Sequence, residues 1–243
     1  MTAIPDEVFS GRPHRLTMGL RSLDLDSWLD PDPHHPQRAQ RATLLTQRRS
    51  DVYAVLPEGR EPARLVAQRV AEQLGLVLPQ SQDPLVDAAL LVRDDLCVLA
   101  RTEGTWRLVA AVVCFPSRWR LADKMGRDVL AIHDPVPGYR SGLGAPTTKV
   151  FDALTPRWRL NWTLLDDPAL FQPAAPAGGH QPGPDSYLRV ERQCLVPVGD
   201  VVAFTIRTDV VALADLPNDR AKAVLEAAST TPADLAAYRG WTG

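Results

Sequence analysis

The chain has 243 residues, of which 45% are hydrophobic and 23% charged, and its formal net charge at pH 7 is −2. This is the composition of a globular protein with room for one large or two small domains. The charge provides no general attraction to nucleic acid or to an anionic membrane surface, and no apolar run approaches the roughly 18 residues of a membrane span. We therefore expect a cytoplasmic protein that binds neither nucleic acid nor membrane.

The N-terminal part of the chain is predicted to be helical. Residues 1–30 have scattered apolar positions without a sustained period, which is typical of an extended arm laid over a core. Residues 36–55 contain no glycine and only an initial proline, so they predict a helix. A second helix is expected over 61–74, and residues 85–92 favour a short helix that ends in a turn. The first helix carries a basic face that is either solvated or a docking surface for an acidic partner: Arg38, Arg41, Arg48 and Arg49.

The hydrophobic period then changes to that of strands. We predict five strands, mostly antiparallel, in one sheet. The last two are joined by a turn at Gly199-Asp200, and alternation in this hairpin directs Arg192 to one face and Glu191 and Gln193 to the other. The predicted strands are residues 96–100, 106–115, 157–165, 188–196 and 201–208.

The segments between the strands complete the predicted fold. Residues 116–155 form an irregular crossover with a short helix near 147–154. Residues 166–186 are rich in proline, glycine and alanine and predict a surface loop or lid, on which His180 is expected to be exposed. Two helices are predicted at the C-terminus, over 218–228 and 232–238.

This order of elements predicts an α+β domain with one curved sheet. The crossover folds over the concave face of the sheet and leaves a pocket between them. We expect a single domain over residues 1–243, with an N-terminal helical extension of about residues 1–93 and C-terminal helices from about residue 217 to 243.

Cysteine use says little about metal binding. Cys97, Cys114 and Cys194 are far apart, and each lies in an apolar segment. Because no two of them form a CxxC pair, neither a structural zinc site nor a protein-held iron–sulfur cluster is indicated. We expect three buried, reduced thiols.

A proline-rich loop in the crossover holds a histidine in the middle of the chain. Its residues are Ile132-His133-Asp134-Pro135-Val136-Pro137-Gly138. The prolines fix φ, so the loop can hold one side chain in one direction at little entropic cost. Such a histidine suits a metal ligand facing a planar cofactor on the sheet. The alternative is a histidine that caps a neighbouring carbonyl.

Six short motifs follow one another between residues 115 and 208, within a family match that runs over about residues 23 to 216. In this order they resemble the haem-dependent oxidative N-demethylase α-subunit family. The six motifs together are a more specific signal than any one of them. The motifs are Phe115-Pro116-Ser117-Arg118-Trp119, Lys124-Met125-Gly126, Ile132-His133-Asp134-Pro135-Val136-Pro137, Arg159-Leu160-Asn161-Trp162, Leu188-Arg189-Val190-Glu191-Arg192-Gln193 and Val202-Ala203-Phe204-Thr205-Ile206-Arg207-Thr208.

The resemblance implies a PAS-like domain with a five-stranded antiparallel sheet that binds haem b through a histidine. It implies oxidation of a small methylated amine, such as dimethylamine, by dioxygen. In that family the electrons come from NADPH through a reductase component with FMN and a 2Fe-2S cluster. Since this chain has no Rossmann glycine motif and no cysteine cluster, the reductase has to be a separate polypeptide.

The resemblance also implies roles for residues of the crossover and the third strand. His133 becomes the axial iron ligand. Lys124 and Arg159 are candidates to bind the haem propionates, as is Arg157, although surface solvation would also explain these cations. Two aromatic residues would wall the pocket unless they belong to the core: Trp119 and Trp162.

Glu191 and Arg207 are the candidate catalytic residues. They lie on adjacent predicted strands and are expected to be cross-strand neighbours. A charged pair in an apolar sheet is costly unless the partners meet each other or a ligand. On the concave face the carboxylate would hold a protonated amine while the guanidinium polarises dioxygen. On the other face the two would be a structural ion pair.

Two other functions fit the same residues. One is a haem-based gas or redox sensor on the same scaffold, which would bind dioxygen without turnover. The other is a haem-free small-ligand-binding or structural module.

Overall fold

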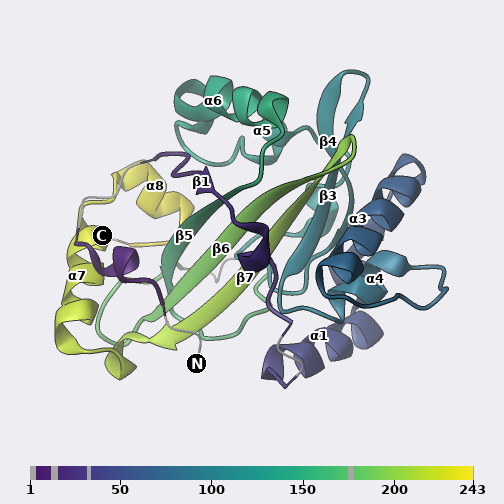
Figure 1. The fold of residues 1–243 in the computed structure, drawn as a ribbon. Coiled ribbons are helices and arrows are strands. Elements are labelled where there is room, and N and C mark those ends of the chain that lie inside the picture. The colour runs from purple at the N-terminus through teal and green to yellow at the C-terminus, as the bar shows by residue number, and fades with distance from the viewer. Residues whose placement is uncertain (1–3, 12–15, 32–33, 175–177, 243) are drawn as a thin grey trace.

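The protein has an α+β fold with a seven-stranded antiparallel sheet in the order β1-β5-β6-β7-β3-β4-β2 (Figure 1). The computed structural model describes residues 4–11, 16–31, 34–174 and 178–242. All five predicted strands are present: β3 (Asp95–Thr102), β4 (Thr105–Val112), β5 (Arg157–Leu165), β6 (Tyr187–Val198) and β7 (Val201–Ala212). The expected number of strands was too small, because two short edge strands extend the sheet: β1 (Arg21–Ser22) and β2 (Tyr53–Val55).

The helical N-terminal region differs in detail from its prediction. The helix expected over 36–55 is divided, because Arg48 leaves the helical region at φ −134° and the last three residues pair with β4. Arg41 does not belong to a solvated basic face, since it is fully buried against the sheet. The helices here are α1 (Pro36–Gln47), α2 (Arg49–Val52), α3 (Arg60–Gln73) and α4 (Pro84–Ala89).

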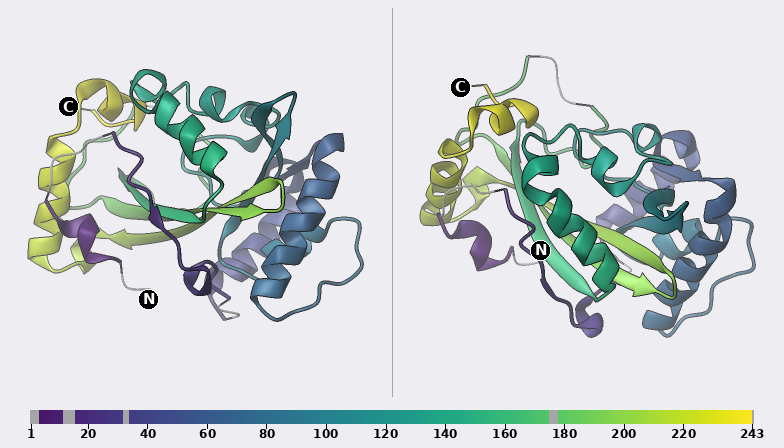
Figure 2. Two further views of the ribbon diagram at one scale, coloured as in Figure 1. Left: turned by 45° about the horizontal axis from the view of Figure 1, so that its top comes forward. Right: turned by 90° about the horizontal axis from the view of Figure 1, so that it is seen from above.

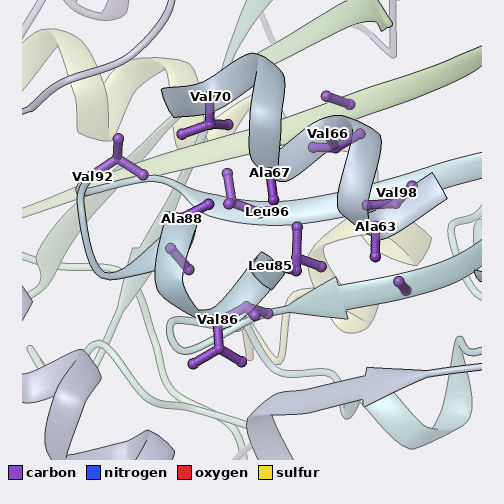
Figure 3. Packing of buried hydrophobic residues seen from close by; sticks show 14 of the residues in the cluster. Ala63, Val66, Ala67, Val70, Leu85, Val86, Ala88, Val92, Leu96 and Val98 are labelled. Atoms are coloured by element: carbon purple, nitrogen blue, oxygen red, sulfur yellow. The ribbon is translucent and has the colours of Figure 1, made fainter. Parts of the chain in front are cut away.

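Helices α1, α3 and α4 cover one side of the sheet, which we call the helical face. Figure 3 shows the small apolar residues of α3, among them Ala63, Val66 and Ala67, packed over Leu96 and Val98 of β3. Ala63 is 4% exposed, and the other four residues are fully buried. Close packing of small side chains brings the helix near the strands, so this side of the sheet is solid core.

The crossover lies on the opposite side, which we call the crossover face (Figure 2). Its helices are η4 (Leu121–Asp123), α5 (Val129–Ile132) and α6 (Tyr139–Ala153). Helix α6 begins eight residues earlier than the predicted start at 147, because Gly138 turns the chain with φ +70°. The internal Pro146 and two glycines of α6 are residues of low helix propensity.

The C-terminal helices are confirmed as α7 (Asn218–Ser229) and α8 (Ala233–Tyr238). The tail after α8 runs beside His180: the backbone N–H of His180 donates to Gly240 O at 2.8 Å, and Thr242 N–H donates to His180 O at 2.8 Å. The prediction that His180 is exposed was wrong, since the tail leaves only 9% of its side chain exposed.

Short 3₁₀ helices connect the remaining elements. They are η1 (Asp6–Phe9), η2 (Leu25–Ser27), η3 (Pro57–Gly59) and η5 (Leu213–Asp215). Within the described part of the chain, no helix has the length and apolar character needed to cross a membrane. The three cysteines are unpaired and buried, as predicted.

Candidate functional site

His133 follows directly after α5, whose start is fixed by Asp128. The carboxylate of Asp128 accepts hydrogen bonds from the backbone N–H groups of Leu130 (2.9 Å) and Ala131 (2.8 Å). One turn later, His133 Nδ1 lies 2.7 Å from Val129 O. A carbonyl only accepts, so Nδ1 carries the proton and Nε2 keeps its lone pair. Nε2 makes no hydrogen bond with any described residue.

The surroundings keep the His133 imidazole neutral. Its ring stacks on Tyr139, with centroids 4.3 Å apart and planes inclined by 7°. Burial lowers the pKa of His133, and the charges of Lys124 and Arg159 lower it further. A neutral imidazole with an available Nε2 is the form that ligates iron.

Lys124 supports the histidine loop from the preceding turn. Its ammonium donates to Ile132 O, the carbonyl directly before His133. Burial lowers the pKa of Lys124. Lys124, expected to bind a haem propionate, therefore lies beside His133. One N–H of its ammonium donates to a backbone carbonyl, and the others could donate to a ligand.

Arg159 projects from β5 onto the crossover face. Its Nε is buried without a hydrogen-bond partner among the described residues, and no ion pair in that part of the chain involves it. Burial lowers the pKa of Arg159, while Tyr139 and Glu191 oppose the shift. Arg157 differs, because its guanidinium donates to Thr155 Oγ1 (3.1 Å) and Ser22 Oγ (3.1 Å) at the exposed edge.

Glu191 lies on the same face and is held from three sides. Its Oε1 accepts from Arg189 Nε at 3.0 Å, and its Oε2 accepts from Gln193 Nε2 at 2.9 Å and from Asn161 Nδ2 at 3.4 Å. Arg189 in turn donates to the backbone carbonyls of Phe115 and Leu170. Sequence reasoning missed Arg189, although its spacing of two from Glu191 on one strand places both side chains on one face.

The expected pairing of Glu191 with Arg207 is wrong. In the sheet Glu191 is opposite Thr208, and Arg207 is opposite Arg192, so the two candidates face opposite sides. Arg207 lies on the helical face, where its Nη1 is 3.1 Å from Asp30 Oδ2. There it lines a separate cavity of about 100 Å³.

The two predicted pocket tryptophans are also separated. Trp119 packs beside Met125 and Ile132 in the crossover-face cluster, close to the His133 loop. Trp162 alternates with Asn161 and packs in the cluster of Leu164 on the other side of the sheet. Only Trp119 is therefore placed to contact a ligand at His133.

The residues of the crossover face fit a haem. A buried guanidinium nitrogen without a partner is costly, and Arg159 Nε is such an atom in a half-buried side chain, so an anionic group on this face would lower its cost. Haem offers two carboxylates together with an iron that accepts a neutral imidazole. His133 supplies that nitrogen, while Arg159 and Lys124 supply cationic partners for the carboxylates.

The fold and site thus define an α+β protein with a histidine whose Nε2 has no partner among the described residues, on the side of the sheet that carries Arg159 and Glu191. A family model described as haem-dependent oxidative N-demethylase, alpha subunit-like, matches residues 67–242. The chain belongs to this family. The matched region includes His133, Arg159 and Glu191, whereas α1 and the N-terminal arm precede it. No curated protein matches the chain.

Proposed function

We propose that the protein binds haem b through His133 Nε2 and catalyses the oxidative N-demethylation of a small methylated amine, such as dimethylamine. The observation that carries this proposal is the half-buried imidazole of His133, whose Nδ1 bonds Val129 O at 2.7 Å while Nε2 has no partner among the described residues. Family membership supports the same chemistry. The bound haem would supply the activation of dioxygen.

The chain's own residues would bind and orient the amine. Glu191 is the proposed catalytic residue, because its carboxylate faces the same side of the sheet as Arg159. Arg189, Gln193 and Asn161 hold this carboxylate in one orientation. An oxygen that accepts one hydrogen bond keeps a second lone pair, so Oε1 can accept a further hydrogen bond from a substrate ammonium group. Arg207 has no part in this site.

We infer that the five central strands form a PAS-like core. Their spatial order is β4-β3-β7-β6-β5, which is 2-1-5-4-3 in order along the chain. The strands β1 and β2 then extend this core at its edges. The crossover helices between the second and third strands carry His133, as expected for a ligand held over the sheet.

Electrons are proposed to come from NADPH through a separate reductase with FMN and a 2Fe-2S cluster, in the cytoplasm. The words "alpha subunit" in the family description support a second polypeptide. Dioxygen and the amine are then the small-molecule partners.

A haemin titration tests the proposal. The wild-type protein is expected to develop a Soret band that is lost or shifted in His133→Ala and retained in the control His180→Gln. A protein that stays colourless with added haemin would contradict the proposal. Formaldehyde release that depends on dimethylamine and a reductant, and that falls in Glu191→Gln, is expected for the enzyme. Dioxygen binding without formaldehyde would indicate a sensor.

A further inference from the structure

Tyr139 stacks on one face of the His133 ring and has no role in the proposed mechanism. The two rings are nearly parallel, with a centroid separation of 4.3 Å and an inclination of 7°. His133 ends α5, and Tyr139 begins α6 after the turn at Gly138. The proline-containing loop between them therefore brings its own two ends together as a stacked pair.

The Tyr139 ring is itself fixed in place. It is 7% exposed, and its hydroxyl lies 3.0 Å from Thr147 Oγ1, two turns along α6. The Thr147 hydroxyl lies 2.7 Å from Leu143 O and donates to that carbonyl. Tyr139 is consequently the donor to Thr147, and α6 fixes both ends of the tyrosine side chain.

We propose that Tyr139 is a positioning residue that sets the ring plane and the tautomer of His133. The hydrogen bond from Nδ1 to Val129 O holds one edge of the imidazole, but a single bond allows the ring to rock about that edge. The stacked tyrosine removes this motion. It also covers one face of the imidazole, so the ring stays in the plane in which Nδ1 donates to Val129 O.

The consequence for the cofactor rests on the proposed function. Partners that orient a metal-ligating histidine typically contribute 10–100-fold to metal affinity. A histidine whose plane is fixed presents the Nε2 lone pair in one direction. Loss of the tyrosine ring should therefore weaken haem binding even though Tyr139 does not touch the iron.

The first arm of the test uses the haem-free protein. Nitrogen NMR of His133 is expected to show only the Nδ1–H tautomer in the wild type, in Tyr139→Phe, which keeps the stack, and in Thr147→Val, which removes only the hydroxyl partner. Tyr139→Leu is expected to show a mixture of tautomers. Should Tyr139→Leu fail to fold, Tyr139→Met fills the site with a flexible side chain and carries the same expectation.

The second arm measures haem affinity by Soret titration. Tyr139→Leu is expected to weaken binding about tenfold, whereas Tyr139→Phe stays within a factor of two of the wild type. A folded Tyr139→Leu protein with one tautomer and wild-type haem affinity overturns the inference. Failure of the wild type to bind haem would refute the proposed function instead, and the NMR arm would still decide whether Tyr139 positions His133.

Discussion

Two arginines on the crossover face differ in how their charge is compensated. Arg189 is 1% exposed and bonds the carboxylate of Glu191 at 3.0 Å, and it also donates to backbone carbonyls. Arg159 has a buried Nε without a partner among the described residues. Burial of a polar nitrogen without a partner opposes folding, and the carboxylates of the proposed haem would offset this cost.

Replacing Arg159 should therefore affect stability and binding in opposite directions. Arg159→Met is expected to raise the free energy of unfolding of the haem-free protein by about 1–3 kcal/mol, since it removes the desolvation cost of a polar group, and to weaken haem binding. Urea unfolding and haemin titration measure the two effects. The control Arg157→Met, at the exposed edge, should change stability by less than about 0.5 kcal/mol. A less stable Arg159→Met protein with unchanged haem affinity would show that Arg159 is structural.

The site residues show which part of the site a sequence can specify. Alternation along one strand correctly placed Glu191 and Gln193 on one face and Arg192 on the other. The relation between strands depends on register, and a shift of one residue reverses every face. Glu191 is opposite Thr208, so the predicted register with Arg207 is wrong by one residue. His133 needed no such register, because its local loop positions it.

At the scale of the elements, long periodic segments were predictable and short ones were not. The five long strands and α3 follow sustained hydrophobic patterns, whereas β1 and β2 are two and three residues long and have no period to detect. Their pairing with β5 and β4 is decided by tertiary contacts. The buried Arg41 on a polar helix is a second such case, because its partner lies on a distant strand.

Arg41 joins α1 to the sheet through a fully buried ion pair. Its Nη1 lies 2.7 Å from Asp95 Oδ1, and both side chains are 0% exposed. The carboxylate also accepts from the backbone N–H groups of Cys114 (3.0 Å) and Phe115 (2.9 Å). Asp95 thus holds α1 and the end of β4 at the start of β3.

Removing one partner of this pair should be more harmful than removing both. Asp95→Ala is expected to cost about 3–5 kcal/mol of unfolding free energy, because it leaves the Arg41 charge buried without its partner. In Asp95→Ala/Arg41→Met that charge is absent, so part of the loss is recovered, while the amides of Cys114 and Phe115 remain unsatisfied. Urea unfolding of the wild type, both single variants and the double variant completes the cycle. Strictly additive losses would contradict the coupling.

At the scale of the whole molecule, the three cysteines lie on both faces of the sheet. Cys97 of β3 belongs to the crossover-face cluster, and Cys114 and Cys194 belong to the helical-face core. Burial raises the pKa of Cys97, that of Cys114 to about 12 and that of Cys194 to about 11. Since the thiolate is the reactive form, none of the three should react in the folded protein.

Thiol modification should consequently report opening of the entire sheet. Each strand from β5 to β4 is hydrogen-bonded to the next, with one register shift in β3 at Val98/Leu99. We therefore expect all three cysteines to react with a disulfide reagent at one common rate, set by the unfolding equilibrium when reclosing is fast. A ligand that binds only the folded state lowers that rate by the factor 1 + [L]/Kd, which is about a hundredfold at 100 times its Kd. Haemin should therefore protect all three thiols equally in the wild type and much less in His133→Ala. One thiol that reacts faster than the others would show that the sheet opens locally. Equal protection by haemin in the wild type and in His133→Ala would show that haem binds elsewhere.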